Sequence, residues 1–287
     1  MPTDSPFVHF FIPYYGPVSF IQETVKSVRE QQGNWHLTII DDQSPYGDIR
    51  PWLAQLNDDR ITYLKNEVNL GLGANFQRCL SLSKGRFTVL LGDDDRLLPQ
   101  YVDRLHAADL EQQFDVYQPV VEVINESGVA VKPLADRVKA LLRPRHSASE
   151  THRGDRLTAS LMTGNWTYFP SLAWRTDVIQ PLGFNVTALV TIDLDLLMKV
   201  LVRGGSMYIG SGAPTFQYRR HARSVSSTQA LDGPRFKEEQ HFFESQAAIF
   251  DSLGWRRSAS ASRLHLTSRV HAMLSSLRTR VIGRSSS

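Results

Sequence analysis

Short apolar segments alternate with amphipathic segments in the first hundred residues, and this alternation constrains the fold more than any other feature. Residues 8–12, 37–40, 61–64 and 87–91 are apolar and rich in β-branched or aromatic side chains, as buried parallel strands are. Apolar residues recur at helical spacing around Ile21 to Val28 and Phe76 to Leu80. Strands that alternate with helices predict an α/β fold built from βαβ units.

Three of these predicted strands are followed by polar residues that can bind a ligand or take part in catalysis. Residues 13–15 (Pro-Tyr-Tyr) follow the first strand, Asp41 and Asp42 follow the second, and residues 93–95 (Asp-Asp-Asp) follow the fourth. In open α/β sheets, ligands bind beyond the carboxyl ends of the strands. We therefore expect the three motifs to converge on one crevice.

The consecutive carboxylates Asp93, Asp94 and Asp95 indicate a cation. Two unit charges about 4 Å apart repel by roughly 4 kcal/mol at an effective dielectric constant near 20, so such a cluster needs donors, basic residues or a metal. Hard oxygen ligands favour Mg²⁺ or Mn²⁺. A solvated acidic turn with Arg96 as its partner is the alternative, but the neighbouring motifs favour a metal site.

Composition narrows the possible functions. A chain of 287 residues with 41% hydrophobic residues can bury a sizeable core, and a net charge of +3 is too small to indicate nucleic-acid binding. One cysteine excludes an internal disulfide framework, and neither a signal peptide nor a membrane span is predicted, so we expect a cytoplasmic protein. Asn165-Trp166-Thr167 and Asn185-Val186-Thr187 match the glycosylation sequon, and we expect both matches to be chance.

The C-terminal region is basic. From Trp255 to the end there are seven Arg and no acidic residue, and apolar residues between Leu266 and Val281 fall on one helical face. A basic amphipathic helix can lie on an anionic membrane surface. The alternative is a helix that packs on the domain or on another subunit. Peripheral contact with the inner face of the membrane is therefore one of two expected roles.

Six motifs occur in a fixed order before residue 105. They are Pro13-Tyr14-Tyr15, Gln31, Asp41-Asp42-Gln43-Ser44, Asn69-Leu70-Gly71 with Asn75, Gly85, and Asp93-Asp94-Asp95 with Pro99. This order resembles the nucleotide-sugar half of the family 2 inverting glycosyltransferases, which have the GT-A fold. This sequence departs from the family pattern at Gly92, where many members carry the first Asp of Leu-Asp-x-Asp-Asp. Asp93-x-Asp95 still matches the DxD signature.

The second half resembles the same family more weakly. Asp193, Lys199 and Gly204 keep the spacing of the segment that carries the family's catalytic base, with Ile192 where an acid usually stands. Asp195, two residues further on, is the alternative base. Tyr218-Arg219-Arg220-His221 with Ser224 and Ser226 resembles a Tyr-Arg-x-His segment of the family. Trp166 and Trp174 either line an acceptor site or pack in the core.

The resemblance implies a GT-A-like mixed sheet flanked by helices. Residues 5–104 would form the nucleotide-sugar-binding half, 105–228 the acceptor-binding half, and 229–287 a helical, basic C-terminal region. The basic composition of residues 133–156 predicts a mobile excursion, a loop that extends from the fold and closes over donor or acceptor.

The implied activity is metal-dependent inverting transfer of a sugar from a UDP-, dTDP- or GDP-linked donor. The acceptor would be a hydroxyl of a glycan or lipid-linked acceptor in cell-surface polysaccharide or glycolipid synthesis. A non-catalytic relative that binds sugar nucleotides is the alternative.

The resemblance also assigns roles to individual residues. Asp193 would be the catalytic base, and Asp93, Asp94 and Asp95 would hold Mn²⁺ or Mg²⁺. Asp42 would accept from the nucleobase edge, for which a turn cap after the second strand is the alternative. Tyr15 would stack near the base, and His221 would contact diphosphate or metal. The nucleotide-binding set comprises Pro13, Tyr15, Asp42, Asn69, Gly71, Asn75, Asp93 and His221.

Overall fold

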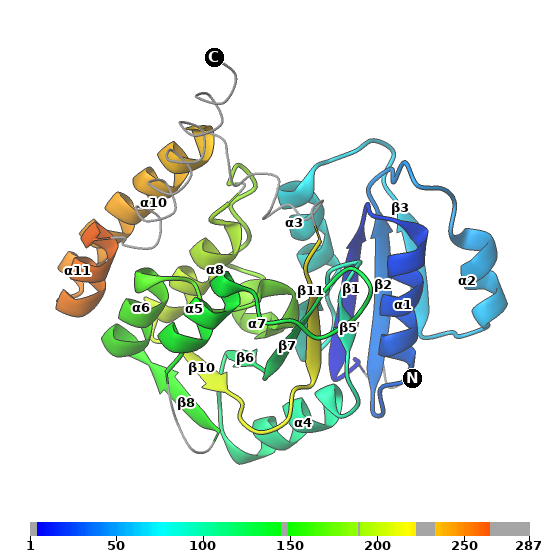
Figure 1. Ribbon diagram of the computed structural model, residues 1–287, viewed down its shortest axis with the longest axis horizontal. Coiled ribbons are helices and arrows are strands. Elements are labelled where there is room, and N and C mark those ends of the chain that lie inside the picture. The colour runs from blue at the N-terminus through cyan, green and yellow to red at the C-terminus, as the bar shows by residue number, and fades with distance from the viewer. Residues whose placement is uncertain (1–4, 145–148, 189, 222–232, 265–287) are drawn as a thin grey trace.

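The computed structural model describes residues 5–144, 149–188, 190–221 and 233–264, and it contains two sheets with helices packed around them (Figure 1). The larger sheet has eight strands in the order β3-β2-β1-β4-β9-β6-β10-β8. The smaller has three strands in the order β5-β11-β7. This mixed architecture confirms the predicted α/β class.

The N-terminal half follows the predicted alternation. Its elements are β1 (Val8–Tyr14), α1 (Val18–Arg29), β2 (Trp35–Asp41), α2 (Arg50–Leu56), β3 (Ile61–Lys65), α3 (Leu72–Leu82) and β4 (Phe87–Leu90). β1 pairs in parallel with both β2 and β4, and β2 pairs in parallel with β3. The four predicted strands are therefore present, and their carboxyl ends lie at one edge of the sheet.

The second half adds antiparallel pairs. Its elements are β5 (Arg96–Leu97), α4 (Tyr101–Glu111), β6 (Val116–Gln118), β7 (Val121–Ile124), α5 (Leu134–Leu142), β8 (Glu150–Arg153), α6 (Gly154–Thr163), the 3-10 turn η1 (Phe169–Ser171), β9 (Ala173–Arg175), α7 (Thr176–Ile179), α8 (Ile192–Leu201), β10 (Ser206–Ile209) and β11 (Phe216–Arg219). β9 runs antiparallel between β4 and β6, and β8 runs antiparallel to β10. The sheet is therefore mixed, as the resemblance implied.

The main sheet is buried on both faces. Successive residues of β1 point to opposite faces, and Phe10, Phe11 and Ile12 are all fully buried. Phe10 and Ile12 belong to one apolar cluster, whereas Phe11 belongs to the other. Burying each such side chain contributes about 1.5–3 kcal/mol. A strand covered on both faces needs the continuous apolar run that the sequence shows.

The prediction of a mobile excursion over residues 133–156 is wrong where the structure describes that segment. It contains helix α5 and strand β8. Asp136 of α5 is buried and forms a two-pronged ion pair with Arg220, with N–O distances of 2.6 and 2.8 Å. Sequence composition did not reveal this pairing, because the two residues lie 84 positions apart.

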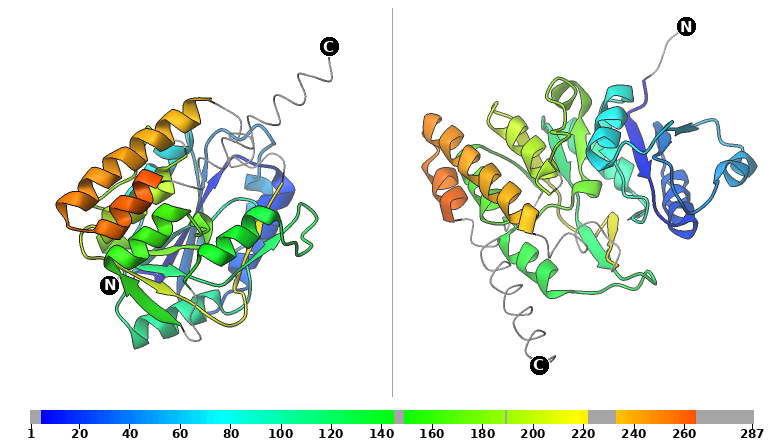
Figure 2. Two further views of the ribbon diagram at one scale, coloured as in Figure 1. Left: turned by 60° about the vertical axis from the view of Figure 1, so that its left-hand side comes forward. Right: turned by 90° about the horizontal axis from the view of Figure 1, so that it is seen from above.

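The C-terminal helices α10 (Gly233–Ser252) and α11 (Arg256–Leu264) pack together, and α11 also packs on α6 (Figure 2). The described part of the C-terminal region is therefore mainly helical. The proposed amphipathic face from Leu266 to Val281 lies outside the described residues. Within the described ranges, no helix combines the length and the apolar character needed to cross a membrane.

Asp155 of α6 caps the first turn of α11. Its carboxylate accepts hydrogen bonds from the backbone N–H groups of Arg257 (3.2 Å) and Ser258 (2.8 Å) and from the Ser258 hydroxyl (2.7 Å). Asp155→Ala should lower the free energy of unfolding by about 1–2 kcal/mol in urea denaturation, because helix N–H groups lose their acceptor. Asp251→Ala is the control, since Asp251 forms an exposed ion pair with Arg263; equal losses would contradict the capping role.

Candidate functional site

The loop after β1 and the acidic segment after β4 are joined directly. One carboxylate oxygen of Asp93 accepts hydrogen bonds from the backbone N–H groups of Tyr15 (3.0 Å) and Gly16 (2.6 Å). The backbone N–H of Asp42 donates to the carbonyl of Tyr14 at 3.0 Å. The structure therefore brings the three strand-end motifs together. The Tyr15 side chain remains 49% exposed at this edge, so its ring is open to a planar ligand.

Asp42 organises the loop that precedes α3. Its two carboxylate oxygens accept from the backbone N–H groups of Leu70 (2.8 Å) and Gly71 (2.9 Å). The carboxamide of Asn66 bridges Asp42 and Asn75, at 2.5 and 3.2 Å. The turn directly after β2 is capped instead by Asp41, which accepts from the N–H of Ser44.

The other predicted nucleotide-binding residues surround Asp42. The Asn69 side chain accepts from the N–H of Gly71 at 2.9 Å, and Gly71 has a φ of 77°, in the region that favours glycine. Pro13 is paired within the sheet opposite Ile40 of β2. Four of the predicted residues, Asp42, Asn69, Gly71 and Asn75, thus form one hydrogen-bonded group.

The three consecutive carboxylates turn toward three different elements. Asp93 holds the loop after β1, whereas Asp94 lies 2.6 Å from Nε2 of His221. Asp95 is fully buried, and its Oδ1 accepts from the backbone N–H of Arg219 at 2.8 Å. Oδ2 of Asp95 has no hydrogen-bond partner among the described residues. The triplet is therefore both a ligand candidate and the structural link between β4 and β11.

Burial and the neighbouring charge raise the pKa of two members of the triplet, Asp93 and Asp95. Burial, followed by the charge of Asp94, raises the pKa of Asp93 to about 6. The same two causes, in the same order, raise the pKa of Asp95. Carboxylates that destabilise one another in this way are relieved by a cation.

The donor set fits a hard divalent cation. It offers carboxylates, which suit Mn²⁺ or Mg²⁺ better than softer metals, and Oδ2 of Asp95 is buried without a hydrogen-bond partner among the described residues. No group of three or more metal-ligating side chains converges within the described part of the chain. Asp93 and Asp94 are the two members of the triplet that are not fully buried.

Gly92 leaves room for this arrangement. A Cβ at this position would lie 2.6 Å from Oδ2 of Asp95 and 2.9 Å from Oδ1 of Asp94. The aspartate that the family pattern implies at this position would displace both carboxylates. The glycine at position 92, where the family pattern has an aspartate, thus leaves space for Asp95 to point inward.

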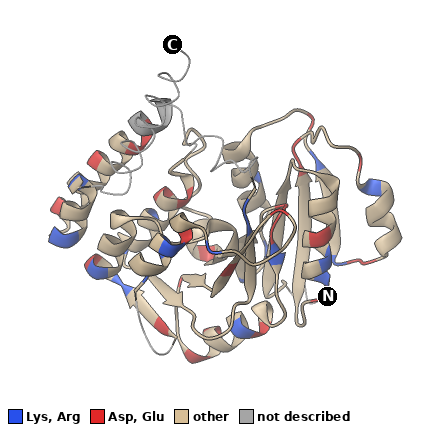
Figure 3. Cartoon of the chain, viewed as in Figure 1, with Lys and Arg blue, Asp and Glu red and all other residues tan. Residues whose placement is uncertain are grey.

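Arg219 supports the triplet from β11, a role that the sequence analysis did not predict. Its side chain is 1% exposed and donates to the carbonyls of Asp94 (2.7 Å) and Glu126 (2.8 Å). It also pairs with Glu23 of α1 at 2.5 Å. Figure 3 shows how the acidic and basic residues are distributed over the chain. The Tyr-Arg-x-His motif was the one feature of the sequence analysis that included Arg219. Ser224 and Ser226, which follow this motif, lie outside the described residues.

Asp193 lies in the first turn of helix α8. Its Oδ2 accepts from the Asn165 carboxamide at 2.9 Å, and its Oδ1 accepts from the backbone N–H of Leu194 at 2.8 Å. Burial raises the pKa of Asp193, while the charge of Lys139 opposes this effect. Asp195 pairs instead with Lys199 on the same helix at 2.8 Å.

Asp193 lies on the same side of the molecule as the Tyr-Arg-x-His motif. Lys139 of α5 interacts electrostatically with both Asp193 and Arg220, and Arg220 directly precedes His221. Trp166 and Trp174 are 2% and 0% exposed, so both pack in the core rather than line an acceptor site.

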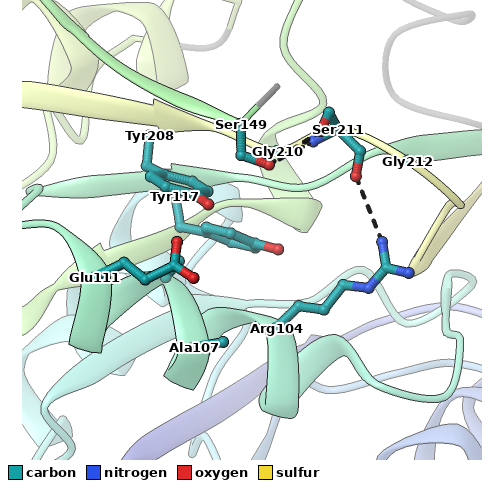
Figure 4. A pocket seen from close by; sticks show the side chains of 10 residues that line it. Arg104, Ala107, Glu111, Tyr117, Ser149, Tyr208, Gly210, Ser211 and Gly212 are labelled. Atoms are coloured by element: carbon teal, nitrogen blue, oxygen red, sulfur yellow. Dashed lines mark hydrogen bonds between the residues drawn. The ribbon is translucent and has the colours of Figure 1, made fainter. Parts of the chain in front are cut away.

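A separate cavity of about 310 Å³ lies between α4 and the ends of β6 and β10. Arg104, Glu111, Tyr117 and Tyr208 line it, together with Ser149 and Ser211 (Figure 4). None of the predicted site residues contributes to its wall. The strand-end crevice, not this cavity, carries the candidate chemistry.

Known proteins resemble this chain in sequence and fold. The putative colanic acid biosynthesis glycosyl transferase WcaA of Escherichia coli is 30% identical over 98 residues, which cover 33% of this chain and 35% of the relative. Residues 1–349 of TarS of S. aureus, solved with UDP-GlcNAc, superpose with a TM-score of 0.64 at 15% identity, and the match covers 82% of this chain and 65% of that TarS chain.

The mannosyltransferase PcManGT of Pyrobaculum calidifontis, solved with GDP-Man and Mn²⁺, has a TM-score of 0.63 at 14% identity. The match covers 98% of this chain and 76% of PcManGT. At these identities, the two structures show a shared fold, which is GT-A. Residues 10–175 match the model of glycosyl transferase family 2, which is more than half of the 287 residues. The strand-end motifs, the fold and this match together show that the chain belongs to glycosyl transferase family 2.

Proposed function

We propose that the protein is an inverting, metal-dependent glycosyltransferase that uses a nucleoside diphosphate sugar and acts in polysaccharide synthesis. The observation that supports this proposal is the presence of two kinds of carboxylate with different surroundings. The crowded Asp93 and Asp94 follow strand β4, whereas Asp193 lies in the first turn of α8 and is bonded to Asn165. One set suits a diphosphate with its cation, and the other suits a general base.

The donor half comprises residues 5–104 in this proposal. The exposed ring of Tyr15 offers a stacking surface for a nucleobase. Asp42 and the loop it holds offer polar groups to the base and ribose, since a carboxylate oxygen has two lone pairs. TarS and PcManGT were solved with UDP-GlcNAc and GDP-Man, which supports a UDP-, dTDP- or GDP-linked donor here.

A divalent ion, Mn²⁺ or Mg²⁺, would be held by Asp93 and Asp94, with Asp95 behind them and His221 beside Asp94. Such an ion supplies positive charge against the diphosphate that leaves during transfer. Arg219 holds the backbone of Asp94 in place, so the ligand set is positioned before donor binds.

Asp193 acts as the base in this proposal, with residues 105–228 shaping the acceptor side. The acceptor hydroxyl oxygen forms a bond to the anomeric carbon, the bond from that carbon to the diphosphate breaks, and the hydroxyl proton passes to the Asp193 carboxylate. Displacement from the face opposite the leaving group inverts the configuration. Burial, which raises the pKa of Asp193, makes this carboxylate a better proton acceptor.

Asp193→Asn should lower turnover at least about a hundredfold while leaving donor affinity unchanged, because only the proton acceptor is lost. Turnover is measured as release of UDP or GDP from a panel of sugar nucleotides with glycan and lipid-linked acceptors. Donor affinity is measured by calorimetry. Asp195→Asn is the matched control. A larger loss in that control would move the base to Asp195, and a wild-type protein that binds donors without turnover would indicate a non-catalytic relative.

Asp94→Asn should abolish the Mn²⁺-dependent rise in melting temperature that UDP or GDP produces, because a neutral amide is a weaker ligand for the cation. The melting temperature without ligand should change little, since Asp94 is partly exposed. Asp103→Asn on the exposed surface of α4 serves as the control. A nucleotide shift that survives in Asp94→Asn would exclude Asp94 as a ligand.

Mn²⁺-dependent nucleotide affinity should fall below pH 6. The pKa of Asp93 is raised to about 6, and a carboxyl group must lose its proton to coordinate a metal. Below that pH, each unit of acidification should weaken binding by up to about tenfold. Calorimetric titrations between pH 5 and 7.5 test this, and a pH-independent affinity would show that Asp93 is not a ligand.

A further inference from the structure

Two Asn-x-Thr tripeptides, expected from the sequence to be chance matches to a sequon, adopt the same hydrogen-bonded turn. In the first, the backbone N–H and hydroxyl of Thr167 donate to Oδ1 of Asn165 at 3.1 and 2.6 Å. In the second, Thr187 donates to Asn185 in the same way at 3.3 and 2.8 Å. The geometry is shared, so their difference lies in their surroundings.

The second turn is exposed at both residues. The first is enclosed, with Thr167 only 1% exposed, and it faces Asp193. Because two donors occupy Oδ1 of Asn165, its Nδ2 must point the other way. That group donates to Oδ2 of Asp193 at 2.9 Å.

Helix α5 holds the first turn from the opposite side. The ammonium group of Lys139 donates to the backbone carbonyl of Thr167 at 2.6 Å and lies 4.4 Å from the centre of the Tyr168 ring. α5 is itself anchored by Asp136, which accepts from the Tyr168 hydroxyl at 2.8 Å and pairs with Arg220. A continuous series of contacts therefore runs from α5 to Asp193.

We propose that Asn165 and Thr167 are positioning residues for Asp193, and that Lys139 secures their turn. We call this series, from Lys139 through Thr167 and Asn165 to Asp193, the Asp193 relay. The inference rests on the proposed function, because the proposed function gives Asp193 the role of catalytic base. With Asn165 bonded to one oxygen and the N–H of Leu194 bonded to the other, the carboxylate plane is set before acceptor arrives.

The relay also stabilises the ionised form of Asp193. Hydrogen bonds donated to a carboxylate, and a nearby positive charge, both lower its pKa. Asn165 and Lys139 supply these two effects against the burial that raises it. Lys139 is in turn faced by Arg220 and Asp136, and burial lowers the pKa of Lys139 to about 8, so it stays largely charged at pH 7.

The sequence itself provides a matched pair of variants. Thr167→Val removes the hydroxyl donor from Asn165 in the relay, and Thr187→Val removes the equivalent donor in the exposed turn. Thr167→Ser keeps the hydroxyl and is the conservative rescue. In protein labelled with ¹³C at aspartate carboxyls, the Asp193 signal is identified by its absence in Asp193→Asn, and its titration needs no substrate.

Thr167→Val should raise the pKa of Asp193 and lower the kcat of UDP or GDP release about tenfold, with the KM for donor unchanged. Thr187→Val and Thr167→Ser should match the wild type in both measurements. If Thr167→Val does not fold, Lys139→Met is compared with Arg137→Met, a change at an exposed position of the same helix, and the same two effects are expected of Lys139→Met alone.

Identical titration of Asp193 in the Thr167→Val and Thr187→Val proteins, or in the two α5 variants, would overturn the relay and leave the proposed function intact. A turnover that Asp193→Asn does not reduce would instead refute the base assignment, and the positioning role would fail with it. These two failures are read from different proteins and are therefore distinguishable.

Discussion

The buried guanidinium of Arg219 is the interaction on which the rest of the site depends. A buried charge is tolerated only when it is paired and hydrogen-bonded, and Arg219 meets this condition with Glu23 and the carbonyls of Asp94 and Glu126. These partners belong to α1, to the turn after β4 and to the turn after β7. One side chain therefore ties together three segments, one of which carries the acidic triplet.

Helix α5 performs a comparable task on the acceptor side. Its Asp136 pairs with Arg220, which directly follows Arg219 in the chain, and its Lys139 contacts the turn that faces Asp193. The two ends of the candidate site, one for the diphosphate and one for the base, thus share a scaffold of β11 and α5. This arrangement explains why a segment that looks like a basic loop in the sequence is ordered as a helix.

Much of the fold was predictable because its determinants are local. The four parallel strands of the first half were found from apolar composition, since strands covered on both faces need continuous apolar runs. α2 was not predicted, because it is only seven residues long. Its Trp52, Leu53 and Leu56 pack partly buried against the core, but so short a helix gives a weak periodic signal. The strands β6, β8 and β9, which take part in antiparallel pairs of the second half, are three to four residues long, too short for a periodic signal.

The sequence by itself determined the fold class, the family and the placement of carboxylates at strand ends, because each depends on residue order over short distances. Only the tertiary structure decided what each carboxylate does. Asp95 meets the backbone N–H of a residue 124 positions away, and Asp193 meets a carboxamide 28 positions away. Such partners depend on how distant parts of the chain pack together. The burial of charged side chains in that packing cannot be predicted from a local sequence pattern. The chain order supplied the chemical groups, and the folded structure assigned their partners.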